Sequence, residues 1–393
     1  MKICVLLEGD IYHLRGEFMA IHNRMKYLVK EPDLDVTIYN IQRYYDNLTS
    51  WVRGNKQIEL KKDFFLDGIH YHCLYYKRSY LDYFLRSISK YQTTVEATRV
   101  KRNKKLFLDC DLIFAHSLYT GLLALDMKRE KGIPFVMMWH GSSIHTFPFQ
   151  NKTTFSLTKT VLQNTDYNFF VSKELHEIAN TIVGSDCVGS VSPNGVDTSV
   201  FYKFSDEKRE EIAKQLQVDT DKVNIGFVGN YLPIKNVQYL PKLFLSIFQD
   251  FPDAVFHIIG SGGFKENYKE SPCSIKYWDN QSPDKMPDLY NCMDLVVMPS
   301  IKEGLPMTCL ESTACGTAFV GSRVGGIADV VGVENTVPFS PTFETDFANL
   351  CKKRLADKNA VLIQLPEQYH VEHIVAAEKR VLIEVLCSKK EKN

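Results

Sequence analysis

The chain has 393 residues, with 47 Lys and Arg against 47 Asp and Glu, and 45% of its residues are hydrophobic. This length suggests two domains, each large enough to bury a core. A formal net charge of zero argues against bulk nucleic-acid binding, because that requires an excess of cations over phosphates. The ten Cys residues form no Cys-x-x-Cys pair, which argues against a zinc ribbon or a dense disulfide framework.

The N-terminal apolar run is too short for a signal peptide, and no segment approaches the roughly 20 apolar residues of a membrane span. We therefore expect a cytoplasmic protein. Residues 77–105 are strongly basic and, if helical, would gather aromatic residues on one face. That pattern is typical of a peripheral helix at the inner face of a membrane, and equally of an aromatic face packed on its own domain.

Short apolar runs alternate with helical stretches in the first half of the chain, as in a parallel sheet covered on both faces. They predict strands at 3–7, 36–41, 69–76, 112–115, 135–139 and 167–171. A Pro-Asn-Gly turn within 191–201, a charged helix at 206–217 and a new strand at 223–228 then indicate a domain boundary after residue 195.

The second half repeats this alternation. It predicts strands at 254–260, 295–298, 318–321 and 337–339, and helices at about 236–249, 284–292, 306–315 and 343–356. The predicted fold class is therefore α/β, with two doubly wound, Rossmann-like domains at 1–195 and 196–366 facing each other across a cleft. A C-terminal helix within 367–393 is expected to pack back towards the first domain.

The segment that begins at Pro299 is the most informative one for chemistry. A strand ends in a loop with Glu303, and a helix begins near Pro306, since Pro is favoured at the first helical position. A helix N-terminus attracts anions such as phosphate, and Glu303 and Glu311 bracket this one. Gly325 and Gly326 precede a short helix at 327–331, where backbone N–H groups could approach a second phosphate.

Each of these signals is weak alone, but their combination closely resembles the nucleotide-sugar site of glycosyltransferase family 4, retaining enzymes of the GT-B fold. The family's Glu-x7-Glu motif is matched by Glu303 and Glu311, and Gly304, Leu305 and Pro306 follow the first Glu. Residues 191–201 look like its inter-domain Pro-Asn-Gly-Val-Asp segment, 227–236 are similar to its Gly-Arg-Leu-x-x-x-Lys-Gly stretch, and 137–145 match its strand-end His.

The resemblance implies roles for particular residues. Glu303 would bind the hydroxyls of the donor sugar, Glu311 the ribose, and Lys235 the departing diphosphate. His140 would donate or accept a hydrogen bond at the donor sugar, and no metal role is expected for it. Gly16 and Gly229 would line the diphosphate.

The sequence departs from the family pattern at Asn230, where Arg is usual. One of two cations on the diphosphate is then missing. Its charge would be balanced by Lys235, by the helix start, or by a neighbour such as Lys302 or Arg323.

No metal site is expected from the sequence. Asp109 and Asp111 precede a strand, as solvated acids commonly do, and Asp219 and Asp221 lie in a charged loop. His70 and His72 would share a strand face, yet no third ligand is near in sequence and zinc requires at least three. No cofactor is expected either, and a nucleoside-diphosphate sugar, with UDP as the favoured base, would be a substrate.

These observations favour a retaining glycosyltransferase with a saccharide or lipid-linked saccharide acceptor, acting in glycan or polysaccharide biosynthesis. Two alternatives stay open. One is a catalytically degenerate subunit that still binds a nucleotide sugar, for which Asn230 is the hint. The other is a sugar-nucleotide epimerase, against which the Glu-x7-Glu motif and the Pro-Asn-Gly segment both argue.

Overall fold

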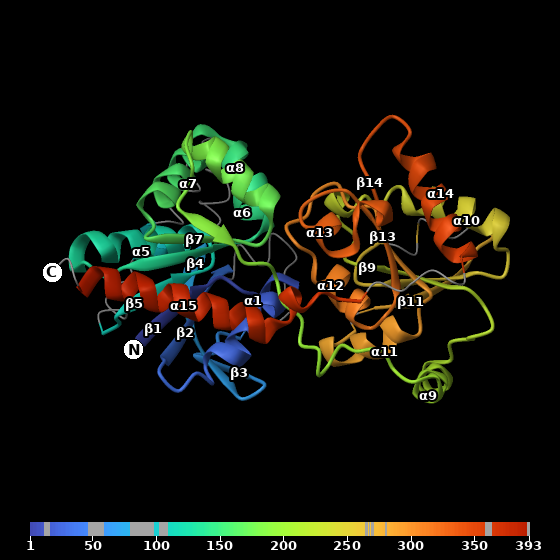
Figure 1. Cartoon of the computed structure of the whole chain (residues 1–393), viewed down its shortest axis with the longest axis horizontal. Coiled ribbons are helices and arrows are strands. Elements are labelled where there is room, and N and C mark those ends of the chain that lie inside the picture. Colours follow the sequence, from blue (N-terminus) through green and yellow to red (C-terminus); the bar gives the residue numbers. More distant parts are fainter. Residues whose placement is uncertain are drawn as a thin grey trace. The chain divides into compact units, whose positions relative to one another are not determined.

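The computed structural model describes residues 1–11, 16–45, 59–78, 98–101, 109–263, 266, 268, 271–279, 281–357 and 364–390. The chain divides into two compact units (Figure 1). Unit 1 consists of Met1–Pro193 together with Glu372–Asn393, and unit 2 of Asn194–Val371. The sequence-based divisions, after residues 195 and 366, lie a few residues from these points.

Unit 1 contains an eight-stranded sheet in the order β3-β4-β2-β1-β5-β6-β7-β8. All neighbouring strands are parallel except β3 and β4, which form an antiparallel pair. The strands are β1 (Lys2–Leu7), β2 (Asp35–Tyr45), β3 (Asp63–Leu66), β4 (Ile69–Arg78), β5 (Leu112–Ala115), β6 (Phe135–Trp139), β7 (Tyr167–Phe170) and β8 (Gly189–Val191). The six predicted strands are all present. The short edge strands β3 and β8 were not predicted, because neither contains a continuous apolar run of sufficient length.

The helices of unit 1 follow their strands, as in other doubly wound sheets. In the described part of this unit they include α1 (Gly16–Leu28), α5 (Leu118–Lys131), α6 (Gly141–His145), α7 (Lys152–Asn164), α8 (Lys173–Val183) and most of α15 (Val371–Lys390). Several begin at N-cap side chains that accept backbone N–H groups, namely Ser117, Asn151 and Ser172. The C-terminal helix α15 lies beside α1 (Figure 1), and Glu378 of α15 accepts a hydrogen bond from Arg24 of α1.

Unit 2 contains a six-stranded, wholly parallel sheet in the order β11-β10-β9-β12-β13-β14. The strands are β9 (Asn224–Val228), β10 (Val255–Ile259), β11 (Ser274–Trp278), β12 (Leu295–Met298), β13 (Ala318–Ser322) and β14 (Thr336–Val337). Counted within the unit, this is the order 3-2-1-4-5-6 of dinucleotide-binding sheets. The edge strand β11 was not predicted, because its sequence mixes polar and aromatic residues.

The helices of unit 2 are α9 (Asp206–Leu216), α10 (Leu240–Asp250), α11 (Met286–Asn291), α12 (Met307–Ala314), α13 (Ile327–Val331) and α14 (Phe343–Ala356). In one buried core, side chains of the sheet pack against side chains of α10 and α14. Phe227 and Phe256 come from the sheet, Phe244 from α10 and Phe347 from α14. Burying such aromatic side chains contributes roughly 1.5–3 kcal/mol each, and this core holds the strand ends of unit 2 in place.

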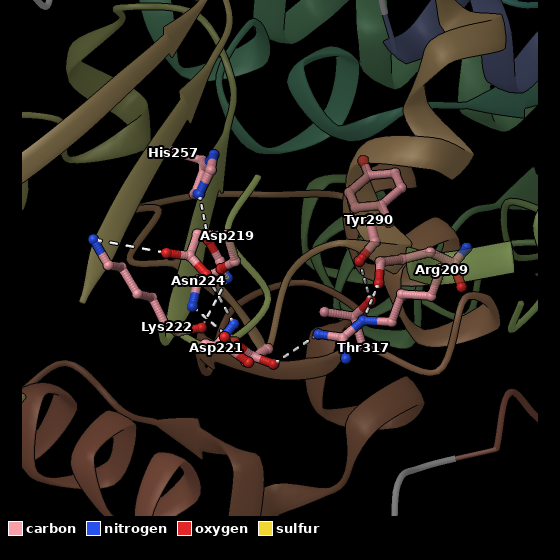
Figure 2. Close-up of polar contacts among 10 residues, drawn as sticks. Arg209, Asp219, Asp221, Lys222, Asn224, His257, Tyr290 and Thr317 are labelled. Carbon is pink, nitrogen blue, oxygen red and sulfur yellow. Dashed lines mark hydrogen bonds and ion pairs between the residues drawn. The ribbon is translucent and has the colours of Figure 1, made fainter. Parts of the chain in front are cut away.

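The amino end of β9 is held by polar contacts of two buried side chains, Asn224 and His257 (Figure 2). Asn224 is fully buried, and its amide donates to the carbonyls of Asp219 and Lys222, at 2.9 Å each. The imidazole Nε2 of His257 lies 2.9 Å from the Asn224 Oδ1. The loop that carries Asp219 and Asp221 is therefore organised around Asn224, at the opposite end of β9 from the strand end where doubly wound sheets bind ligands.

None of the helices in the described part of the chain combines the length and the apolar character needed to cross a bilayer. The basic segment predicted at 77–105 lies for the most part outside the described residues.

Candidate functional site

The carboxyl ends of β9 and β12 form the topological switch point of unit 2. The two strands are neighbours in the sheet, and the chain leaves them in opposite directions, towards β10 and β13. In doubly wound sheets, ligands bind at this point, because the diverging loops leave a crevice there. The backbone N–H of Ile301, after β12, donates to the carbonyl of Ile234, after β9, at 2.8 Å, so the two loops are joined.

A lysine and a glutamate meet at this switch point. Lys235, in the loop after β9, places its Nζ 2.7 Å from Oε1 of Glu303, in the loop after β12. The lysine side chain is 23% exposed and the glutamate side chain 10%. Sequence analysis assigned both residues to the donor, and the structure brings them into direct contact across 68 residues of chain. In such a sheltered place, charge interactions are stronger than at an open surface.

The stretch from Glu303 to Leu305 is held by its neighbours. The N–H of Gly326 donates to the Gly304 carbonyl at 2.7 Å, and the side-chain amide of Asn194 donates to the Leu305 carbonyl at 2.6 Å. Gly325 has φ +58°, and a Cβ placed there would lie 2.3 Å from the Gly304 oxygen. The N–H of Gly326 is therefore used within the protein to position the Glu303 loop.

The second glutamate of the motif lies on α12. Pro306 has extended backbone angles and is the N-cap of this helix, which begins at Met307, next to the predicted start near Pro306. Glu311 receives a hydrogen bond from the hydroxyl of the buried Tyr290, 2.9 Å from its Oε2. Burial raises the pKa of Glu311 to about 7, while the Tyr290 hydroxyl acts in the opposite direction.

Asn230, which replaces the family's Arg, has a structural role. Its Oδ1 accepts hydrogen bonds from the Ser261 N–H at 3.2 Å and from the Ser261 hydroxyl at 2.9 Å. Gly260 approaches Gly229 so closely that a Cβ would lie 2.1 Å from the Gly229 carbonyl oxygen. The loops after β9 and β10 are thereby joined through an acceptor that an arginine side chain lacks.

Arg323, one of the cations proposed to balance the diphosphate, is engaged elsewhere. Its guanidinium donates to the hydroxyl of Thr336 and to the carbonyl of Val333, both at 3.1 Å. It therefore links β13 to the segment before β14. Lys235, in contrast, is directly paired with Glu303.

In unit 1, two buried histidines follow neighbouring strands. His140 follows β6 and caps α6, and His116 follows β5. His116 Nδ1 lies 3.3 Å from His140 Nε2, with the rings stacked at 20°. Burial, and then the nearby Arg24, lower the pKa of His140 to about 3. The pKa of His116 lies well below its usual range for the same first reason, so both rings are neutral at pH 7.

His116 was not among the residues predicted from the sequence. A usable signal existed, because His116 follows the apolar strand 112–115 in the same way as His140 follows 135–139. Because β5 and β6 are parallel neighbours in the sheet, the histidines that follow them lie at the same edge.

Two further parts of unit 1 contain residues considered from the sequence or lie beside them, the start of α1 and the surroundings of β1. Gly16 is the exposed first residue of α1. Gly9, after β1, exchanges two hydrogen bonds with the Asn40 side chain, at 2.8 and 2.9 Å. Asp109 and Asp111 bind Lys2, through its Nζ at 2.7 Å and its backbone N–H at 2.8 Å, so these acids secure the start of β1.

Comparison with known proteins defines the class of the molecule. Its fold is the GT-B fold. Sucrose-phosphate synthase from Thermosynechococcus elongatus matches with a TM-score of 0.73 at 15% identity, covering 99% of this chain and 100% of that one. HepE of Anabaena in complex with UDP-glucose matches with a TM-score of 0.68 at 15% identity and the same coverage.

Sequence comparison gives the family. Residues 68–200 match the model of glycosyltransferase family 4, and residues 208–368 match that of the group 1 glycosyl transferases. These two matches together cover about three quarters of the chain, which belongs to glycosyltransferase family 4.

Two relatives with named activities are similar to this chain in sequence. The putative teichuronic acid biosynthesis glycosyltransferase TuaC of Bacillus subtilis is 30% identical over 62% of this chain. The Escherichia coli UDP-Gal:alpha-D-GlcNAc-diphosphoundecaprenol alpha-1,3-galactosyltransferase is 26% identical over 55% of it. The chain spans 60% of the length of the first relative and 58% of the second.

Proposed function

We propose that the protein is a retaining glycosyltransferase that moves a sugar from a nucleoside-diphosphate sugar to a hydroxyl of a saccharide or lipid-linked saccharide. The observation that carries this proposal is the Lys235–Glu303 contact at the switch point of unit 2. A UDP-sugar donor is supported by the UDP-Gal donor in the name of the Escherichia coli relative and by the UDP-glucose in the HepE complex. The biosynthetic setting is supported by the similarity to TuaC, whose name assigns it to teichuronic acid biosynthesis.

The pairing of Lys235 with Glu303 prepares both groups for the donor. A diphosphate carries more negative charge than one carboxylate, so it competes for the Lys235 ammonium. Glu303 then becomes available as an acceptor for sugar hydroxyls. In the reaction, the bond from the anomeric carbon to the diphosphate breaks and its electron pair leaves with the nucleotide. Lys235 would stabilise that charge.

Retention follows if the acceptor attacks from the face that the leaving group vacates. The acceptor oxygen bonds to the anomeric carbon, and its proton passes to an oxygen of the departing phosphate. Neutral His140 suits a hydrogen bond to the donor sugar and is not suited to general acid catalysis, because its pKa lies near 3. Glu311, on α12, would bind the ribose.

The runner-up function is a degenerate subunit that binds the nucleotide sugar without transferring it. Asn230 was its only support in the sequence. The hydrogen bonds of Asn230 to Ser261 provide a reason for this residue that does not involve loss of activity. An epimerase gains no support from the described residues. Peripheral membrane contact through 77–105 would suit a lipid-linked acceptor and is part of the same proposal.

The test measures donor binding and sugar transfer separately. Thermal unfolding of the purified protein is followed with UDP, GDP, ADP, CMP and TDP and their sugar conjugates, with and without EDTA. We expect stabilisation by UDP and a UDP-sugar, unchanged by EDTA. Glu303→Ala should retain UDP binding and lose transfer by roughly a hundredfold or more. Lys235→Ala should weaken UDP binding by roughly tenfold or more.

Lys242→Ala is the matched control, because Lys242 forms an exposed ion pair with Glu344 in the same unit and should change neither property. Wild-type transfer rates in Glu303→Ala would refute the site. Binding of a nucleotide sugar without transfer to any acceptor would favour the degenerate subunit.

A further inference from the structure

The hairpin of β3 and β4 brings three potential metal ligands to one face. In the antiparallel register, Asp63 lies opposite His72 and Phe65 lies opposite His70. Side chains alternate along a strand, so these four residues share a face. The residues between them point the other way, where the Tyr71 ring packs at 5.6 Å from that of Phe18 on α1. The sequence showed only the two histidines, and the hairpin supplies the third ligand.

The three ligand atoms converge. Asp63 Oδ1 lies 2.6 Å from His70 Nε2 and 3.3 Å from His72 Nδ1, and one ligand atom from each residue lies within 4.8 Å of the others. In a tetrahedral zinc site with bonds of about 2.0–2.1 Å, neighbouring ligand atoms are about 3.3 Å apart. The Asp63–His72 distance already has this value. The shorter Asp63–His70 hydrogen bond would open when a metal ion replaces its proton.

The imidazole rings are held in place by aromatic neighbours. Phe65 stacks on His70 with ring centroids 4.5 Å apart and planes within 9°. Tyr39 of β2 lies against His72 with centroids 5.2 Å apart. The ligand side chains are 39%, 39% and 48% exposed for His70, His72 and Asp63, which leaves one side of the cluster open to water. Restrained rings lower the entropic cost of assembling a metal site.

We propose that Asp63, His70 and His72 form a zinc-binding site, with water as the fourth ligand, that clamps the edge strand β3 onto β4. Two imidazoles and one carboxylate suit zinc better than magnesium or calcium, which prefer oxygen ligands. The cluster belongs to unit 1, whereas the Lys235–Glu303 site belongs to unit 2. The bound ion stabilises the hairpin, since binding free energy at a site absent from the unfolded chain adds to folding stability.

The test uses tag-free, full-length protein stripped of metal by a chelator that is then removed. Zinc is titrated in competition with a chromogenic indicator. We expect one zinc ion per chain, and affinity reduced at least tenfold in His70→Ala, His72→Ala and Asp63→Asn. His373→Ala removes an exposed histidine on α15 and should bind zinc like the wild type.

Cobalt provides a second measurement, because a tetrahedral site gives Co²⁺ an intense visible absorption that an octahedral hydrated ion lacks. We expect this absorption in the wild type and its loss in Asp63→Asn, a variant that preserves side-chain size if a histidine variant fails to fold. No stoichiometric zinc binding, or equal affinity in wild type and all three ligand variants, would overturn the site. Neither result depends on sugar transfer, so the proposed activity is tested independently.

Discussion

Glu311 combines burial with a neighbour that donates a hydrogen bond to it. Burial favours its protonated form and raises its pKa to about 7, against an ordinary value of 4.5. Between these values the folded protein binds a proton that the unfolded chain releases. The contribution of Glu311 to stability therefore falls as pH rises from about 4.5 to 7 and is level above that range. Such a carboxylate is costly for the fold, as is common where a residue serves a ligand.

Glu311→Gln should remove this loss. The glutamine oxygen can still accept from Tyr290, and no charge forms in the sheltered site. We expect the variant to gain roughly 1–2 kcal/mol over the wild type at pH 8, after allowing for partial exposure of the side chain, and much less at pH 5. Thermal unfolding of both proteins at pH 5, 6, 7 and 8 measures the difference. Glu210→Gln, at an exposed position of α9, is the control. A difference that is constant over this pH range would contradict the argument.

At the scale of elements, the Glu303 loop depends on the turn before α13. Gly325 adopts φ +58°, which suits glycine, and lies against the carbonyls of Glu303 and Gly304. The next residue, Gly326, donates its N–H to the same loop. The turn at Gly325 and Gly326 thus fixes the position of the Glu303 loop, although the two segments are separated in sequence.

Gly325→Ala should disturb both segments. The added Cβ would lie 2.6 Å from the Glu303 carbonyl and still closer to that of Gly304, so the loop has to shift. We expect weaker UDP binding and at least tenfold slower transfer, because an ångström of displacement in a site is costly. Gly184→Ala is the matched control, since Gly184 also has positive φ, at +84°, but open space around its Cβ position. It should affect stability without affecting donor binding, and equal losses of binding in both variants would count against the loop argument.

Sequence reasoning predicted the fold because apolar strands and their order leave few alternatives. It found β12 and α14 to the residue, since continuous apolar or amphipathic runs define them. It missed β11, whose mixed composition at a sheet edge has no clear period. For the candidate donor site it named Lys235 and Glu303, but not the contacts of Asn230 with Ser261, and in unit 1 it did not place Asp63 beside His70 and His72. Contacts of those kinds depend on strand register and loop geometry, which residue spacing does not reveal.

At the scale of the whole molecule, the chain passes twice between the units, near Pro193 and near Val371. The two passes are bonded to each other within unit 2, where Val196 donates to the Tyr369 carbonyl and accepts from the Val371 N–H. In unit 1, Arg24 connects the same two segments of the chain, at Pro193 and on α15. Its fully buried guanidinium binds Glu378 of α15 at 3.0 Å and the Pro193 carbonyl at 2.6 Å.

A buried ion pair of this kind matters most when one partner is lost. Glu378→Leu leaves the Arg24 charge buried without its carboxylate, and Arg24→Met leaves the carboxylate without its cation. Each single variant should lower the free energy of unfolding by roughly 3–5 kcal/mol. The double variant, Arg24→Met with Glu378→Leu, removes both charges and leaves no unpaired charge buried. The double variant should therefore be more stable than the two single losses predict when added.

Thermal unfolding midpoints of the four proteins measure this coupling. The single variants should fall by roughly 6–12 °C, and the double variant by clearly less than their sum. Lys379→Ala is the control on the neighbouring position of α15, because its ion pairs with Glu31 and Asp33 are more exposed, and a loss under roughly 3 °C is expected. Strictly additive losses would mean that Arg24 acts through its carbonyl contacts alone. In that case, the C-terminal helix would be held to unit 1 by its apolar face, and the Arg24–Glu378 pair would add nothing to that attachment.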